Sequence, residues 1–284
     1  MLQDELAHPS LLGHNPRLSY PIVSIVHHLR ASESRPLSPL YRALERRYLH
    51  TVDGVVCNSD VTRDVVTDLG VAAERTVVAP PAGDRFDPAI DAETIARRGR
   101  RAPLQVVFVG GLEPRKGLDT LVEALARVDP PVELTVVGRT VDAGYVADVE
   151  RAIDRHGLAD RVTLAGELSD RALADTLRQS HVLAVPSRYE GFGIVYLEAM
   201  SFGLPVIATS AGGAREVVAD GETGVLVAPD DPAAVAAAIE RFDADRDRLV
   251  SMGTAARRRY ESHPDWTESA DRVRRLLASV VDAA

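Results

Sequence analysis

Short runs of apolar, mostly β-branched residues alternate with helical patterns along this sequence, and this alternation limits the possible folds more than any other feature. In the second part of the chain the apolar runs lie at 104–110, 132–138, 161–166, 181–186, 204–209 and 224–229. Helical patterns cover 117–128, 143–156, 170–179, 193–202 and 232–243. Continuous apolar strands joined by helices are typical of a parallel sheet with helices on both faces. The pattern therefore predicts an α/β, Rossmann-like domain with six strands.

The first part of the chain has only three such runs, at 21–26, 54–59 and 76–80, followed by a polar stretch at 83–103. We therefore predict a partial Rossmann-like domain with its linker at 1–100 and a complete one at 101–262. A C-terminal helix at 263–284 is expected to return to the first domain. Three strands are too few to bury a parallel sheet on both faces, so the apolar side chains of 21–26 should lack part of their cover.

Composition excludes several classes of protein. The formal net charge is -9 and the pI is about 5.4, which argues against a nucleic-acid partner. The sequence contains no run of 18 apolar residues, so it predicts no membrane span, and the N-terminus lacks the pattern of a signal peptide. The single cysteine, Cys57, fits a reducing compartment. We expect a cytoplasmic protein.

The stretch "VGGLEPRKGLDT" places Arg115 and Lys116 just before a predicted helix. The N-terminal end of a helix is positive, so cations are unfavourable there unless an anion joins them. Lys116 is also the single lysine in a chain with 33 basic residues. Gly110 and Gly111 have no side chains, so a ligand can approach the backbone closely there. This pattern predicts a phosphate or diphosphate site. The alternative is two exposed cations in a loop. The spacing excludes a P-loop and a dinucleotide fingerprint.

The stretch "SRYEGFGIVYLEAM" places Glu190 in a loop after a strand and Glu198 about one turn into the next helix. Backbone N–H groups at Gly193 and Ile194 begin that helix and suit an anion. Carboxylates accept hydrogen bonds from hydroxyls. Together these groups predict a ligand with both phosphates and hydroxyls, such as a nucleotide sugar. The alternative is that both acids only stabilise the helix dipole.

The motifs "EGFGIVYLEA", "GLPVIAT", "GGAREVV" and "GETGVLVAPDD", with "VGGLEPRKG" before them, resemble the donor-binding half of family-4 retaining glycosyltransferases of GT-B fold, also called glycosyltransferase group 1. The resemblance runs from about residue 104 to Trp266. It implies a metal-independent hexosyltransferase that retains the anomeric configuration and uses no cofactor, with a nucleotide-diphosphate sugar as its donor substrate. Many relatives have arginine in place of Gly111, so one phosphate contact is absent here. Nothing before residue 100 resembles the glycine-rich loop that opens the family's acceptor domain.

The resemblance also implies residue roles. Lys116 and Arg115 would neutralise the donor diphosphate, Glu198 would hold the ribose, and Glu190 would bind hydroxyls of the sugar. His27 and His28, at the end of the strand 21–26, would act with Glu190 as catalytic residues. No metal site is expected; the Asp-x-Asp within "DADRD" at 243–247 is interpreted as solvated. The donor-binding set is Gly110, Gly111, Arg115, Lys116, Gly166, Glu167, Leu168, Glu190, Gly191, Phe192, Gly193, Ile194 and Glu198.

Partners are less specified. The acceptor is unidentified, with a lipid or a polysaccharide as candidates. Arg42, Arg46 and Arg47 form a basic helical face that either meets an anionic lipid at the inner membrane surface or is simply solvated. A chain lacking its first strands is expected to self-associate or to need a partner that supplies them. The alternative functions are a non-catalytic or split nucleotide-sugar-binding fragment and a nucleotide-sugar epimerase of the same fold.

Overall fold

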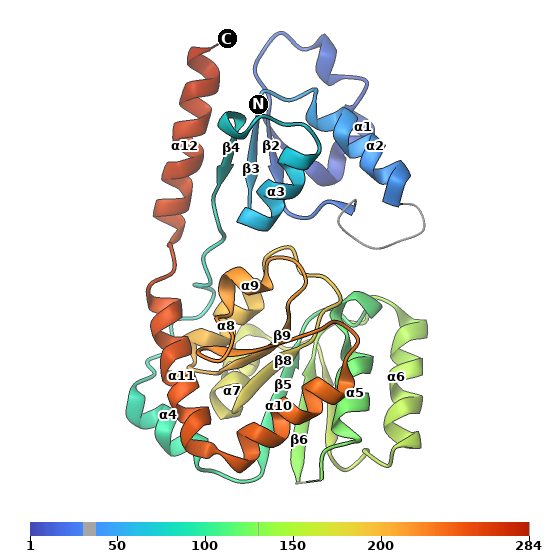
Figure 1. Cartoon of the computed structure of the whole chain (residues 1–284), viewed down its shortest axis with the longest axis vertical. Helices are drawn as coiled ribbons and strands as arrows, with labels where there is room; N and C mark the ends of the chain where they lie inside the picture. Colours follow the sequence, from blue (N-terminus) through green and yellow to red (C-terminus); the bar gives the residue numbers. More distant parts are fainter. Residues whose placement is uncertain (31–37, 130, 284) are drawn as a thin grey trace. The chain divides into compact units, whose positions relative to one another are not determined.

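The computed structural model describes residues 1–30, 38–129 and 131–283, and the chain divides into two compact units. Unit 1 comprises Met1–Ala82 and Pro264–Ala284, and unit 2 comprises Gly83–His263. Each unit contains an all-parallel sheet with helices packed on it (Figure 1). The predicted α/β architecture is confirmed. No helix in the described ranges has the length and apolar character needed to cross a bilayer.

The sheet of unit 2 has six strands in the order β10-β9-β8-β5-β6-β7, and every neighbouring pair is parallel. The interior strands β8 and β9 are buried along their whole length, which explains their uninterrupted apolar sequence. All six predicted strands are present. Their bounds are β5 (Leu104–Val109), β6 (Val132–Val137), β7 (Val162–Gly166), β8 (Val182–Val185), β9 (Val206–Thr209) and β10 (Gly224–Val227).

Two sets of helices pack in unit 2. Helix α5 contacts α6 and α10, while α11 contacts α4 and α8 (Figure 1). The chain runs outward from β5 to β6 and β7, then returns through α7 to β8 on the other side of β5. The helix bounds are α4 (Ala92–Gly99), α5 (Leu118–Leu125), α6 (Ala143–Arg155), α7 (Asp170–Gln179), α8 (Ile194–Ser201), α9 (Ala214–Val217), α10 (Pro232–Ala244) and α11 (Arg246–Glu261).

The reversal of strand order between β5 and β8 is a topological switch point. Open α/β sheets bind ligands at such a point, beyond the carboxyl ends of the strands, because the loops on either side diverge and leave a crevice. The loops that follow β5 and β8 are the ones that carry Lys116 and Glu190. The fold therefore brings the two predicted ligand-binding stretches to one place.

Unit 1 contains four strands, not the three expected, in the order β1-β2-β3-β4. The additional strand is β1, which pairs with β2 in parallel through Leu2, Gln3 and Asp4. Three residues are too few to show a strand period, and two of them are polar, so the sequence pattern missed this strand. The bounds in unit 1 are β1 (Leu2–Asp4), β2 (Val23–Val26), β3 (Gly54–Cys57), β4 (Thr76–Val78), α1 (His8–Leu11), α2 (Ser38–Leu49), α3 (Asp60–Asp68) and α12 (Trp266–Asp282), with short 3-10 turns at Glu5–Ala7, Asn15–Arg17 and Ala73–Arg75.

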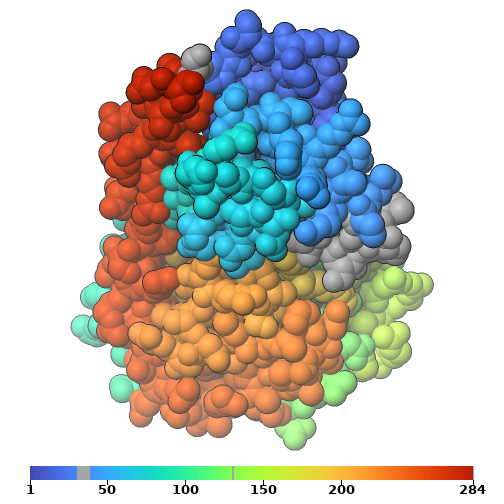
Figure 2. Space-filling view, turned by 45° about the horizontal axis from the view of Figure 1, so that its top comes forward, coloured from blue at the N-terminus to red at the C-terminus, as the bar shows by residue number. Residues whose placement is uncertain are grey.

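The expectation that the segment 21–26 lacks cover is wrong. Val23 and Val26 are 1% and 0% exposed. Val26 packs in a cluster with Tyr48 of α2, and Val23 packs in another with Leu276 of α12, so both faces of β2 are covered. Figure 2 shows the last turns of α12, in red, beside the first residues of unit 1, in blue.

The polar segment before β5 belongs to unit 2, although the sequence assigned it to the first domain. The Arg98 guanidinium, on α4, donates to the carbonyl oxygens of Phe202 and Gly203 at 2.9 and 2.7 Å. Ile95 packs so closely on Gly203 that a Cβ there would lie 2.4 Å from its Cδ1 atom. The boundary therefore lies between Ala82 and Gly83.

Candidate functional site

The loop after β5 is shaped by a glycine that allows close packing. It contains a 3-10 turn over Pro114–Lys116, and Gly117 then starts α5 with a φ of 71°. A Cβ at Gly117 would lie 2.2 Å from the carbonyl oxygen of Pro186, the residue that follows β8. Only glycine fits this contact, and it holds Lys116 against the loop that carries Glu190.

The loop after β8 is fixed by two further glycines. Glu190 forms a parallel bridge with Gly212, and its carbonyl oxygen accepts from the Gly213 amide at 2.8 Å. A Cβ on Gly212 would lie 2.1 Å from the Glu190 carbonyl oxygen, and one on Gly213 would lie 2.4 Å from that of Gly191. Gly212 and Gly213 were not among the predicted site residues. Their signal was the Gly-Gly pair of "GGAREVV", just after β9.

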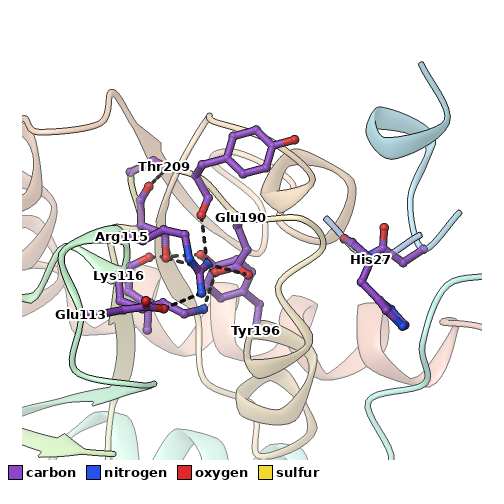
Figure 3. Close-up of polar contacts among 11 residues, drawn as sticks. His27, Glu113, Arg115, Lys116, Glu190, Tyr196 and Thr209 are labelled. Carbon is purple, nitrogen blue, oxygen red and sulfur yellow. Dashed lines mark hydrogen bonds and ion pairs between the residues drawn. The ribbon is translucent and has the colours of Figure 1, made fainter. Parts of the chain in front are cut away.

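Four charged side chains meet between these loops (Figure 3). Lys116 Nζ lies 2.7 Å from Glu190 Oε2, and Arg115 lies 2.7 Å from Glu113 and 3.9 Å from Glu190. The Ser187 hydroxyl donates to the same Glu190 oxygen at 3.1 Å. The Lys116 and Glu190 side chains are 13% and 11% exposed. Two cations and two carboxylates thus balance in a partly buried cluster.

The beginning of α8 offers backbone donors beside this cluster. Its N-cap is Gly193, with a φ of 93° and no side-chain capping bond. A Cβ at Gly193 would lie 2.3 Å from the Tyr196 ring, which is itself fixed by a 3.1 Å bond to the Val185 carbonyl oxygen. Ile194, the first helical residue, is 40% exposed. The first N–H groups of α8 can therefore receive an anion.

Glu198 lies in the second turn of α8 with its side chain 9% exposed. Burial raises the pKa of this carboxyl group, and the Arg85 guanidinium, 3.9 Å from Oε1, lowers it in part. Arg85 also bonds to Asp170 at the start of α7. Arg85 was not predicted as a site residue, because it lies in the polar segment that was interpreted as a linker.

The other predicted donor-binding residues lie at the ends of the same strands. Gly110 donates to the Val137 carbonyl oxygen at 3.0 Å, and a Cβ at Gly111 would lie 2.9 Å from Val141. Gly166, at the end of β7 with a φ of 68°, accepts from the Gly138 amide at 2.9 Å. Beside these, Glu167 is exposed, Leu168 is half-buried, and Gly191 and Phe192 are buried.

The two predicted histidines lie in unit 1, directly after β2. The backbone N–H groups of His27 and His28 donate to the Glu5 carboxylate at 3.1 and 3.3 Å. Burial raises the pKa of Glu5. His27 Nε2 lies 3.6 Å from Asp4 Oδ2, and Asp4, Glu5 and His27 bring potential metal-ligand atoms within 4.8 Å of one another. This cluster was not anticipated, because β1 was not predicted.

Comparison with known proteins places these motifs in a family. Residues 93–259 match the model described as "Glycosyl transferases group 1", and residues 5–84 match that described as "Glycosyltransferase Family 4". The chain belongs to the group 1 glycosyltransferase family. This group 1 chain is 35% identical to a D-inositol 3-phosphate glycosyltransferase of Geodermatophilus obscurus, over 94% of its own length and 62% of the relative's. It is 32% identical to a glycogen synthase of Mycobacterium tuberculosis, over 87% of its own length and 60% of the relative's.

Solved structures agree with the family assignment. A sucrose-phosphate synthase from Thermosynechococcus elongatus matches with a TM-score of 0.84 and 27% identity, over 100% of the group 1 chain and 74% of the synthase chain. Anabaena HepE, solved with UDP and glucose, matches with a TM-score of 0.84 and 23% identity, over 98% and 77% of the two chains, which shows a shared fold. The predicted GT-B type of fold is confirmed. The group 1 chain spans about three fifths of the length of the curated relatives.

Proposed function

We propose that unit 2 binds a nucleotide-diphosphate sugar and that the protein transfers this sugar to an acceptor with retention of anomeric configuration. One observation carries the proposal: Lys116 and Arg115, in the loop after β5, meet Glu190, in the loop after β8, at the switch point. The start of α8, which has no side-chain cap, lies beside them, and Glu198 follows in the second turn of that helix. Cations and free N–H groups suit a diphosphate, and buried carboxylates suit hydroxyls. The related glycosyltransferases support the same reaction class.

In the proposed complex the diphosphate lies between Lys116, Arg115 and the first turn of α8. Glu198 accepts from the ribose hydroxyls and Glu190 from the hydroxyls of the transferred sugar. The base passes the backbone of 166–168 at the end of β7. Each of these groups lies at the carboxyl end of β5, β7 or β8, in the loop that follows it, or in the first two turns of α8, where ligands of such sheets bind.

The chemistry follows from where charge develops. When the bond between the anomeric carbon and the phosphate oxygen breaks, the sugar becomes positive and the leaving diphosphate becomes more negative. Lys116, Arg115 and the α8 N–H groups stabilise that negative charge without a metal ion. We propose His27, His28 and Glu190 as the catalytic residues that stabilise the positive sugar. Transfer that depends on an added divalent cation, or that stops with a chelator, would contradict the metal-independent part of this proposal.

A second candidate is a nucleotide-sugar-binding module that needs an N-terminal partner for turnover. The observation that favours it is the sheet of unit 1, which ends at the three-residue strand β1 with Met1, Leu2 and Leu6 exposed by 56%, 48% and 73%. Apolar side chains beside a sheet edge suit a further polypeptide segment. A lipid or polysaccharide acceptor belongs to both candidates. The exposed arginines of α2 (Arg42, Arg46 and Arg47) are proposed to meet an anionic membrane surface on the cytoplasmic side.

The decisive experiment is a thermal-shift panel of UDP-, GDP- and ADP-sugars, followed by transfer assays with the best donor. Glu198→Ala should weaken binding of the nucleotide itself, because its proposed partner is the ribose. Glu150→Ala is the matched control, because Glu150 is an exposed carboxylate on α6 and is not among the donor-binding residues. Donor binding with transfer supports the enzyme, and donor binding without transfer supports the module. No stabilisation by any nucleotide sugar would refute both.

A further inference from the structure

The proposed function leaves one contact of Glu190 unexplained. Its carboxylate is assigned to sugar hydroxyls, yet in the structure it is the counter-ion of Lys116 at 2.7 Å and lies 3.9 Å from Arg115. Both members of the Lys116–Glu190 pair are largely buried, so their attraction is less screened than that of a surface pair. A diphosphate that contacts Lys116 therefore competes with Glu190 for the same ammonium group.

Glu190 is held in a way that keeps it close to any such diphosphate. Its backbone is clamped by Gly212 and Gly213, where no side chain fits, and its carboxylate accepts from the Ser187 hydroxyl at 3.1 Å. A carboxylate that loses its cation in a poorly solvated place needs other donors. The hydroxyls of a hexose can supply those donors, whereas a nucleoside diphosphate brings only further negative charge to this position.

We propose that Glu190 sets the preference of this site for the nucleotide sugar over the free nucleoside diphosphate, by competing with the diphosphate for Lys116. This inference rests on the proposed function. With the sugar present, Glu190 exchanges its ion pair for hydroxyl donors. After transfer the sugar leaves with the acceptor, and Glu190 returns to Lys116 and weakens the hold on the nucleoside diphosphate. Glu190 thus promotes product release as well as sugar recognition.

Calorimetry on the full chain tests the proposal with three ligand pairs, UDP with UDP-glucose, GDP with GDP-mannose and ADP with ADP-glucose. Glu190→Gln keeps the shape of the side chain and removes its charge. We expect it to tighten binding of the nucleoside diphosphate about tenfold, the value of one moderate charge interaction, and not to tighten binding of the sugar form. Glu113→Gln is the matched control, because Glu113 pairs with Arg115 at 2.7 Å in the same cluster. It should change the affinities for both members of a ligand pair by the same factor.

A double variant tests the route of the effect. In a Lys116→Met background, Glu190→Gln should no longer tighten binding of the diphosphate, because the competition is for Lys116. Unchanged or weaker diphosphate binding in Glu190→Gln would overturn the proposal. It would also be overturned if Glu113→Gln changed the ratio of the affinities for the diphosphate and its sugar form as much as Glu190→Gln does. If Glu190→Gln does not fold, Glu190→Asp withdraws the carboxylate from Lys116, and the same tightening is expected. If the wild-type chain binds none of the three nucleoside diphosphates and none of their sugars, the proposed function fails; if it binds one pair and Glu190→Gln does not tighten binding of that diphosphate, only this inference fails.

Discussion

At the scale of single residues, the site depends on backbone atoms that approach closely where glycine stands. Gly117 lets the turn that carries Lys116 touch the end of β8, and Gly212 and Gly213 let another loop clamp Glu190. Charged side chains alone would not reach one another with this geometry. The ion cluster is therefore a product of glycine placement as much as of its charges.

Gly117→Ala should destabilise the protein and weaken nucleotide binding together. Gly157→Ala is the matched control, because Gly157 has a similar φ of 65° and no atom within 4 Å of the position that a Cβ would take, whereas at Gly117 that Cβ meets Pro186. The control should lose about 1–2 kcal/mol for the left-handed backbone alone. Gly117→Ala should lose about 1–3 kcal/mol more from the overpacked contact. Denaturant melts and nucleotide titration would measure both effects; equal losses in the two variants would show that the close contact is unimportant.

Lys116→Ala should weaken binding of a nucleoside diphosphate by about 1.5–3 kcal/mol, the range for charge-assisted hydrogen bonds. The diphosphate loses a cation, whereas the Glu190 carboxylate loses its counter-ion already in the free protein, so the measured loss is the difference between these two interactions of Lys116. Arg127→Ala, which removes an exposed cation just after α5, should leave the affinity unchanged. Calorimetry of both variants decides the matter, and an unaltered affinity in Lys116→Ala would remove Lys116 from the phosphate site.

Sequence reasoning found the acids and cations of the site because their residue types and spacing carry the chemistry. It did not find Ser187, Arg85 or Gly212, which act by holding other residues. A serine or a glycine has many roles, and only its neighbours in space reveal which one it performs. The ion pair between Lys116 and Glu190 was also out of reach, since 74 residues separate its members.

At the scale of helices and strands, prediction succeeded where an element carries a long apolar run. Each of the six strands of unit 2 is at least four residues long and contains buried residues, so its apolar pattern is visible in the sequence. β1 has three residues, and its position is decided by pairing with β2. The helix α4 was not predicted, because most of its residues are polar or charged. Its buried residues include Ile95 and Arg98, which pack on the rest of unit 2. Short or polar elements depend on tertiary partners that local sequence does not show.

His181 joins three elements of unit 2 and should make stability depend on pH. Its Nδ1 atom accepts from the Gln105 amide in β5 at 2.8 Å, so Nε2 carries the proton and donates to the Arg98 carbonyl oxygen of α4 at 2.8 Å. Burial lowers the pKa of this imidazole to about 4. The unfolded chain binds a proton as pH falls below about 6.5, while the folded chain does not until about pH 4. The stabilisation is therefore complete above pH 6.5 and is lost as pH falls.

The free energy of unfolding should fall by about 2–3 kcal/mol between pH 7 and pH 4 through this residue, at about 1.4 kcal/mol per pKa unit. The measurement is the difference between wild type and His181→Gln in denaturant melts across that range, because other groups titrate in both proteins. Gln179→Ala, which changes an exposed residue without an ionisable group close to His181 in sequence, should keep the pH slope of the wild type. A slope in His181→Gln equal to that of the wild type would show that His181 is not the titrating group.

At the scale of the whole molecule, the sheet of unit 1 ends at β1 beside exposed apolar side chains. Such an edge promotes association. The second candidate, a binding module, predicts that the chain binds a nucleoside diphosphate but transfers sugar slowly or not at all, and that it self-associates or needs a partner segment. Sedimentation equilibrium gives the mass, and Leu2→Lys should shift it toward the monomer while leaving nucleotide affinity unchanged. Rapid transfer by a monodisperse wild-type monomer would contradict the prediction.

Unit 1 is assembled from both ends of the chain, and this has a consequence for its synthesis on the ribosome. The face of its sheet that carries Val23 and Val56 is covered by Leu276 of α12, and the Ser269 hydroxyl bonds to the Pro80 carbonyl oxygen at 2.6 Å. Roughly 180 residues of unit 2 are translated between these partners, which takes about 10–40 s at ordinary rates. Unit 2 is contiguous and can fold during that interval. The first strands must wait with one apolar face bare until α12 emerges, and during that interval a nascent-chain chaperone has a surface to protect.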